Sequence, residues 1–171
     1  MTDQAEALNQ IAQFEAHYKY DTSYMRDLLE HSPEGFAKFN NFLPLARHRE
    51  KLSNNDYWMA KIAAMQAQDC GECLQLNVRM ALEAGVAREL VQAAVRGGDT
   101  LPADLQDVYF YAKCIAANVP IAEDLKDRIE ARFDKGARLE FGIAIATAGI
   151  FPGIKRAIGT AKSCSLIDIE V

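Results

Sequence analysis

Two cysteines three residues apart, in the segment Cys70-Gly71-Glu72-Cys73, are the residues of this chain whose types and spacing point most directly to chemistry. The helix signals around them place the pair at a helix start, where residues i and i+3 project from the same side and can close a disulfide with little backbone movement. Free backbone N–H groups and the positive end of the helix dipole favour thiolate over thiol there. Such a thiolate can attack a disulfide or a peroxide, and the second cysteine can then resolve the product.

Two other interpretations of the cysteine pair stay open. A pair with this spacing can be half of a zinc site, but two more ligands are needed. The remaining cysteines and histidines stand singly in the sequence: Cys114, Cys164, His17, His31 and His48. Cysteine is also often buried, so both residues can simply belong to the core. The short spacing at a helix start favours a redox pair, and no metal or other cofactor is predicted.

Helix start and stop signals recur along the chain and indicate the elements that hold the pair. Ser53 followed by Asp56 predicts a helix to about residue 68, and a second helix is expected from the cysteines to Gly85, which supplies a left-handed stop. Other helices are predicted after Asp3 to residue 18 and over residues 23–30, 33–44, 87–96, 102–118, 122–133, 137–151 and 154–163. With no long linker between them, these elements predict a single domain over residues 1–171.

Composition supports an all-α fold, a bundle of about eight to ten helices, because Ala and Leu are common whereas Val and Thr are few. A net charge of -5 gives no general attraction to nucleic acid or anionic membrane. The longest apolar stretch, residues 141–151, is too short to span a bilayer and is expected to be a buried helix. Four cysteines and an acidic start without a signal-peptide pattern favour a cytoplasmic protein.

The residues around the cysteine pair resemble the carboxymuconolactone decarboxylase superfamily, and within it the alkylhydroperoxidase D (AhpD-like) branch. The resemblance rests on residues 52–56, the cysteine pair, the helix end at residues 84–86 and the segment 151–159, and it covers about residues 40–160. It implies an all-helical fold, a homotrimer or homohexamer, and a thiol-dependent peroxidase in antioxidant defence. It also implies a protein dithiol or lipoyl-type reductant, with Cys73 attacking the peroxide and Cys70 resolving it. Position on the helix alone instead makes Cys70 the more accessible thiol.

The chain departs from that branch at the residues of its usual proton relay. Members typically carry a Glu twelve residues before the first cysteine, a His four residues after the second, and in some cases a His just before the second. These places hold Trp58, Asn77 and Glu72. Asn77 shares a helix face with both cysteines and can hydrogen-bond a thiol, but it cannot take a proton at neutral pH. Glu72 can relay a proton if burial raises its pKa; otherwise it is a solvated acid of the first helical turn.

Other residues are weaker candidates. His48 titrates near neutrality and is the best distant substitute for the missing relay, although it also fits a helix end. Trp58 fits either the core or the wall of an apolar pocket above the thiols. A basic strip formed by Lys155, Arg156 and Lys162 is expected to be solvated or to make salt bridges between subunits.

The sequence therefore predicts a thiol-dependent peroxidase or disulfide reductase acting on a small or organic peroxide, without nucleic-acid or membrane partners. The residues predicted to act are, for catalysis, Cys70, Cys73 and Glu72 and, for substrate binding, Asn77, Trp58 and His48. Because the usual relay is missing, the alternative is a non-enzymatic redox-sensing oligomer whose disulfide switches assembly or partner binding. Lactone decarboxylation is less well supported, because it does not use a cysteine pair.

Overall fold

The computed structural model describes residues 4–171, and this part of the chain is built from helices without strands. The helices are α1 (Gln4–Tyr18), α2 (Ser23–His31), α3 (Pro33–Ala46), α4 (Asn54–Ala67), α5 (Gly71–Glu83), α6 (Arg88–Val95), α7 (Ala103–Ala117), α8 (Glu123–Arg132), α9 (Lys135–Ala148) and α10 (Ile150–Ala157), followed by a short 3-10 turn, η1 (Cys164–Leu166). The predicted all-α class and number of helices are confirmed. Asp3, the predicted cap of the first helix, lies outside the described residues.

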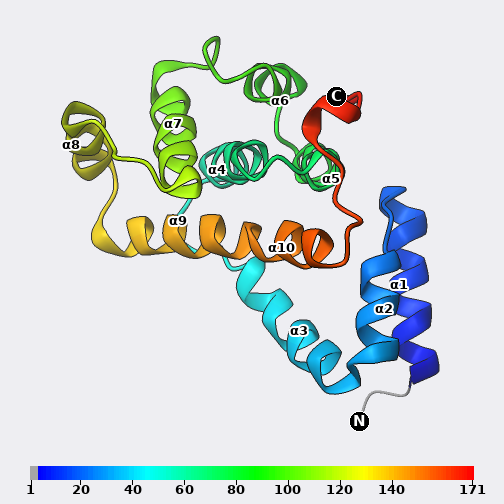
Figure 1. Ribbon diagram of the computed structural model, residues 1–171. Helices are drawn as coiled ribbons and strands as arrows, with labels where there is room; N and C mark the ends of the chain where they lie inside the picture. Colours follow the sequence, from blue (N-terminus) through cyan, green and yellow to red (C-terminus); the bar gives the residue numbers. More distant parts are fainter. Residues whose placement is uncertain (1–3) are drawn as a thin grey trace.

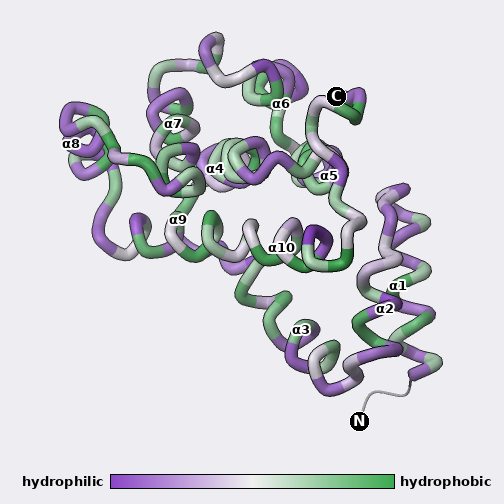
Figure 2. The backbone as a smooth tube through the Cα atoms, viewed as in Figure 1, coloured by the Kyte–Doolittle hydropathy of each residue, from purple (hydrophilic) through white to green (hydrophobic). Residues whose placement is uncertain are grey.

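Helix α4 lies at the centre of the main core, packed against α5, α6, α7 and α9 (Figure 1). All ten residues from position 56 to position 65 are buried. A helix covered on all sides in this way is a core helix rather than an amphipathic surface helix. The outer helices α1 and α8, by contrast, carry both hydrophilic and hydrophobic stretches (Figure 2). The central position of α4 means that even its polar side chains face the protein interior.

Helices α1, α2 and α3 form a second, smaller apolar cluster. The first two make an antiparallel hairpin beside α5 and α10, and α3 leads from this hairpin to the main core (Figure 1). Buried residues of the cluster include Tyr20, Tyr24, Phe36 and Phe39. Phe151 of α10 packs against both clusters. The hairpin therefore brings residues near the start of the chain alongside α5, which carries the cysteine pair.

The Ser53 cap and the Gly85 stop are confirmed, whereas the predicted helix ends at residues 44 and 151 are wrong. The Ser53 hydroxyl accepts a hydrogen bond from the Asp56 N–H at 3.1 Å, and Gly85 follows α5 with a φ of +84°. However, α3 continues two residues beyond Pro44. Likewise, the break near the end of the chain comes at Gly149 rather than at Pro152, which lies in the first turn of α10. Proline lacks a backbone N–H, and the N–H groups of the first turn have no intrahelical partner, so the helix loses no hydrogen bond.

Helices α9 and α10 form one helical run, Lys135–Ala157, that is long and apolar enough to cross a membrane by length and composition alone. One face of this run is packed inside the protein, with Phe141, Ala144, Ile145 and Ala148 each at most 3% exposed. A core helix meets the same length and composition test. The expected burial of this stretch is confirmed for that face, and the absence of a membrane partner stays a prediction.

Candidate redox site

The cysteine pair lies at the start of α5, as predicted. Cys70 is the residue that caps the helix, and Cys73 lies in its first turn. Their sulfurs are joined in a disulfide, with the two Cα atoms 5.3 Å apart, within the usual range for this bond. Asp69 turns the chain into the helix with a φ of +47°, a left-handed conformation in which Asp is enriched. The local backbone geometry alone thus brings the two sulfurs together.

The two sulfurs have different surroundings. Cys73 lines a cavity of about 520 Å³ between the α1–α2 hairpin, α3, α4 and α5. Cys70 has no exposed surface and lies at the helix end that the C-terminal segment covers. There the Gly71 N–H donates a hydrogen bond to the Lys162 carbonyl at 2.9 Å, and a Cβ at position 71 would lie 2.6 Å from Ile167. The expectation that Cys70 is the more accessible thiol is wrong, because this segment covers it.

The structure places two of the three predicted substrate-binding residues in the cavity wall. Trp58 and Asn77 line it beside Cys73. The Asn77 amide donates a hydrogen bond to the Cys73 carbonyl at 2.8 Å rather than to a thiol. His48 is not among the lining residues; it follows α3 and lies near Glu140. The fold therefore does not bring His48 to the cysteine pair.

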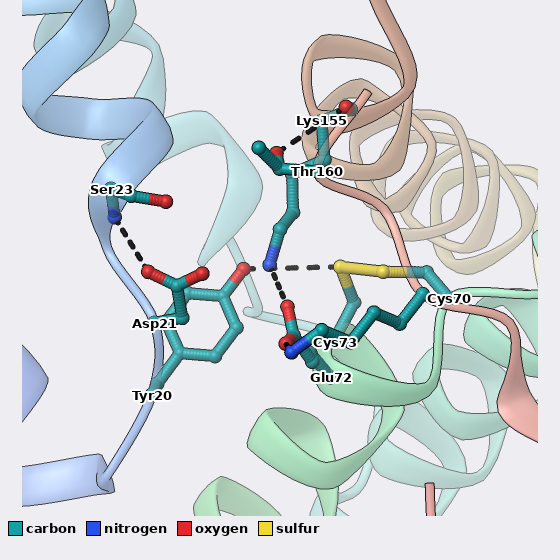
Figure 3. A network of polar contacts seen from close by, with 9 residues as sticks. Tyr20, Asp21, Ser23, Cys70, Glu72, Cys73, Lys155 and Thr160 are labelled. Atoms are coloured by element: carbon teal, nitrogen blue, oxygen red, sulfur yellow. Dashed lines mark hydrogen bonds and ion pairs between the residues drawn. A yellow bond between two sulfur atoms is a disulfide. The ribbon is translucent and has the colours of Figure 1, made fainter. Parts of the chain in front are cut away.

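The carboxylate of Glu72 points toward the ammonium of Lys155 (Figure 3). It forms ion pairs with Lys155 and, at 2.8 Å, with Lys162. Partial burial alone would raise the pKa of Glu72, but the hydrogen bonds and charges of the two lysines outweigh burial and hold this pKa below its ordinary value. Both sequence interpretations of Glu72 need correction. It is ionised near neutral pH and holds no proton to relay, and it is not a solvated acid.

Lys155 also differs from its predicted role as part of a solvated basic strip. Its side chain is completely buried beside Glu72. The ammonium nitrogen lies 4.8 Å from the centre of the Tyr20 ring and 5.5 Å from that of Tyr24, so both rings face the charge. Cation–π contacts of this kind and the carboxylate partner together compensate for the lost hydration. A buried positive charge is thereby fixed next to the first turn of α5.

Tyr20 is the functional candidate that the sequence did not reveal. Its hydroxyl points toward the Cys73 sulfur at 3.8 Å (Figure 3). Burial raises the pKa of this phenol well above its ordinary value, so the hydroxyl keeps its proton. Tyr20 lies in the connection between α1 and α2, 53 residues before Cys73, and no spacing rule links it to the cysteines. Only the packing of the hairpin against α5 brings it to the site.

Residues outside the pair do not extend it into a larger cluster. Cys114 and Cys164 are free thiols of intermediate burial. Partial burial and the nearby Asp69 raise the pKa of Cys164 to about 11, so it is protonated at neutral pH. Between residues 4 and 171, no three His, Cys, Asp or Glu side chains gather as metal ligands do. The chemistry available at the site is therefore that of the dithiol and disulfide, with a phenol, a buried lysine and an apolar cavity around it.

Comparison with known proteins shows what the chain is similar to. Residues 33–104 match the Carboxymuconolactone decarboxylase family. No curated protein matches the chain significantly. Among solved structures, the chain is similar to the debrominase Bmp8, crystallised as a cysteine-to-alanine variant in complex with 2,3,4-tribromopyrrole. The TM-score is 0.74 at 15% identity, covering 100% of this chain and 89% of that one. The predicted resemblance to this family is thus confirmed over residues 33–104.

Proposed function

We propose that this protein is a thiol-dependent peroxidase that uses Cys73 and Cys70 to reduce a small or organic hydroperoxide. One observation carries the proposal: Cys73 lies in the cavity wall with the Tyr20 hydroxyl 3.8 Å from its sulfur, and that sulfur is joined to the Cys70 sulfur in a disulfide. A substrate in the cavity meets Cys73, while the resolving thiol is already in place.

The reaction begins with the reduced pair. The Cys73 thiolate attacks one peroxide oxygen, the O–O bond breaks, and the other oxygen leaves as an alkoxide that takes a proton to become an alcohol. Cys73 is now a sulfenic acid. The Cys70 thiolate attacks the Cys73 sulfur, the S–S bond forms, and hydroxide leaves as water. Two electrons from an external dithiol then restore the pair and leave the carrier as a disulfide.

Tyr20 and Lys155 replace the missing relay in this proposal. The Tyr20 hydroxyl donates its proton to the leaving oxygen as the O–O bond breaks, and the phenolate then regains a proton from solvent. The helix start and the buried Lys155 charge favour the thiolate. Glu72 acts as a positioning residue that holds Lys155 in place through their ion pair.

The electron donor and the assembly are also part of the proposal. A protein dithiol or lipoyl-type carrier would reduce the disulfide, because the reaction needs two electrons that the protein itself does not hold. Assembly as a homotrimer or homohexamer and a cytoplasmic location belong to the proposal through the family resemblance stated for the sequence.

The experiment measures hydroperoxide consumption coupled to a dithiol. Cys73→Ser should abolish turnover, whereas Cys70→Ser should stop it after one equivalent and leave a sulfenic acid that a dimedone-type reagent traps at Cys73. Cys114→Ser removes a free thiol outside the site and should change nothing. Wild-type turnover in both pair variants would exclude this function. A redox-dependent change of assembly without turnover would support the sensor alternative instead.

A second candidate is reductive dehalogenation of a small aromatic compound. Two observations favour it: the fold neighbour is a debrominase, and aromatic residues such as Phe14, Tyr57 and Trp58 line the cavity next to Cys73. The balance is similar, since an aryl bromide and two thiols give the reduced arene, bromide, a proton and a disulfide. Bromide release from a bromopyrrole, measured beside peroxide consumption under the same conditions, separates the two candidates.

A further inference from the structure

Lys61 is a second buried cation, and neither the cysteine chemistry nor the predicted relay uses it. It lies on α4 within the cavity wall and is 6% exposed. Its ammonium donates a hydrogen bond to the Ala46 carbonyl at 3.3 Å and lies 5.8 Å from the centre of the Tyr57 ring. Unlike Lys155, it makes no ion pair with any carboxylate in the described part of the chain.

The charges around the cavity are one-sided. Arg47, Arg49 and Lys61 line it, and neither Asp nor Glu does. This is the reverse of the whole chain, in which 24 acidic residues outnumber 19 basic ones. A concave surface with charges of one sign raises the local concentration of ligands with the opposite sign. The cavity therefore attracts anions although the protein as a whole repels them.

Apart from the amides of Gln10, Asn40, Asn54 and Asn77, the rest of the lining is mainly aromatic rings and aliphatic side chains. A volume of about 520 Å³ lies within the range of small-molecule sites, which commonly combine an apolar lining with a few polar groups that fix orientation. A simple inorganic anion would leave most of this apolar surface without a contact. The ligand that fits both features has a hydrophobic body and one anionic group.

We propose that the cavity binds an organic acid, with its carboxylate held by Lys61 and its apolar body against the aromatic wall next to Cys73. This inference rests on the proposed peroxidase function, and it names the substrate class as organic acids that carry a hydroperoxide group besides the carboxylate. Burial lowers the pKa of Lys61 to about 8, so the lysine is still mostly charged at pH 7. A bound carboxylate relieves the cost of keeping that charge out of water.

Binding is measured on the oxidised protein, where no turnover occurs. Trp58 is the single tryptophan of the chain and lines the cavity, so its fluorescence reports occupancy. The probes are decanoate and the uncharged decanol, which share one apolar chain. Wild-type protein should bind decanoate at least about tenfold more tightly than decanol, the size expected for one hydrogen bond to a charged group. Equal affinities for the two probes would overturn the proposal.

Substitution then tests the residue itself. Lys61→Met keeps the length of the side chain and removes its charge. It should weaken decanoate binding about tenfold while decanol binding stays within about twofold. Lys126→Met, at an exposed lysine of α8 outside the cavity, should change neither affinity. An unchanged preference for decanoate in Lys61→Met would overturn the assignment. If that variant does not fold, the wild-type comparison of the two probes decides.

The outcome is independent of the peroxidase assay. If decanoate is preferred and peroxides are not reduced, the cavity still binds an organic acid and the proposed reaction fails. If peroxides are reduced and the two probes bind equally, the reaction stands and the anion site fails.

Discussion

The two faces of the disulfide differ in what they meet. On the Cys73 face lies a cavity with aromatic walls, a phenol hydroxyl and cationic side chains. On the Cys70 face lies the C-terminal segment, held to α5 by a pair of hydrogen bonds between Gln75 and the Glu170 backbone at 2.9 and 2.7 Å. The disulfide therefore lies between a cavity of small-molecule size and a surface that the C-terminal segment covers.

In the proposed peroxidase reaction, this difference assigns the two half-reactions to opposite faces. A peroxide small enough for the cavity can reach Cys73 without moving the backbone. In that proposal a protein dithiol is too large for the cavity and approaches from the Cys70 face, where the C-terminal segment has to open locally. Local opening of a terminal segment costs far less than global unfolding. Oxidation and reduction can then be altered by substitutions on different sides of the site.

The largest effect is expected from Glu72→Gln, which removes the carboxylate partner of the completely buried Lys155 between the two faces. Leaving one charge of a buried ion pair without its partner costs about 3–5 kcal/mol. Urea denaturation of the oxidised protein measures this loss. Lys162→Gln, which removes the exposed partner of the same carboxylate, should cost less than about 1 kcal/mol. Equal losses of unfolding free energy in the two variants would mean that the buried ion pair stabilises the protein no more than the exposed one.

The next largest effect concerns the cavity face alone. Tyr20→Phe removes the hydroxyl near Cys73 and should slow the oxidation of the reduced pair by peroxide on the order of a hundredfold, the lower range for acid–base catalysis. Stopped-flow measurement of Trp58 fluorescence follows this step. Tyr111→Phe, at a tyrosine of α7 that does not line the cavity, is the control. Reduction of the disulfide by a dithiol should be unchanged in both variants.

A smaller effect is expected on the Cys70 face, which the C-terminal segment covers. In Gly71→Ala the added Cβ would meet Ile167 at 2.6 Å and Ser163 at 3.0 Å, so the tail must move away. Dithiol reduction of the disulfide should become about tenfold faster, because less local opening is needed. Gly142→Ala, where a Cβ meets nothing within 4 Å, should leave this rate unchanged. A faster oxidation by peroxide in Gly71→Ala would contradict the separation of the two faces.

The smallest effect is a pH dependence of stability. The folded protein lowers the pKa of Glu72, so this group contributes stability above its ordinary pKa of 4.5, and the contribution is lost as pH falls through the lowered value. Wild-type protein should therefore lose more unfolding free energy below about pH 4.5 than Glu72→Gln does. The difference between the two proteins isolates this group from Glu140 and Asp69, whose pKa values are also lowered. Parallel curves for the two proteins would count against the role of this ion pair.

Local signals explain which parts of the site the sequence predicted. The cysteine pair, the helix start and the Ser53 cap depend on residues within one turn of each other, and all three are confirmed. Tyr20 and Lys155 depend on contacts across 53 and 83 residues, which no local pattern encodes. The burial of Lys61 could not be predicted from the sequence for a related reason. A lysine on a helix is ordinarily solvated, and only the packing around all sides of α4 buries this one.

Asp69 has two structural roles, one through its backbone and one through its side chain. Its left-handed backbone turns the chain into α5, and its carboxylate holds the tail by accepting hydrogen bonds from Ser163 and Cys164, both at 2.9 Å. Glycine would keep the turn and release the tail, whereas glutamate would keep a carboxylate and disfavour the turn. Asparagine is the single exchange that retains both. Substitution at this one position is therefore constrained twice, by the start of α5 and by the C-terminal segment that covers it.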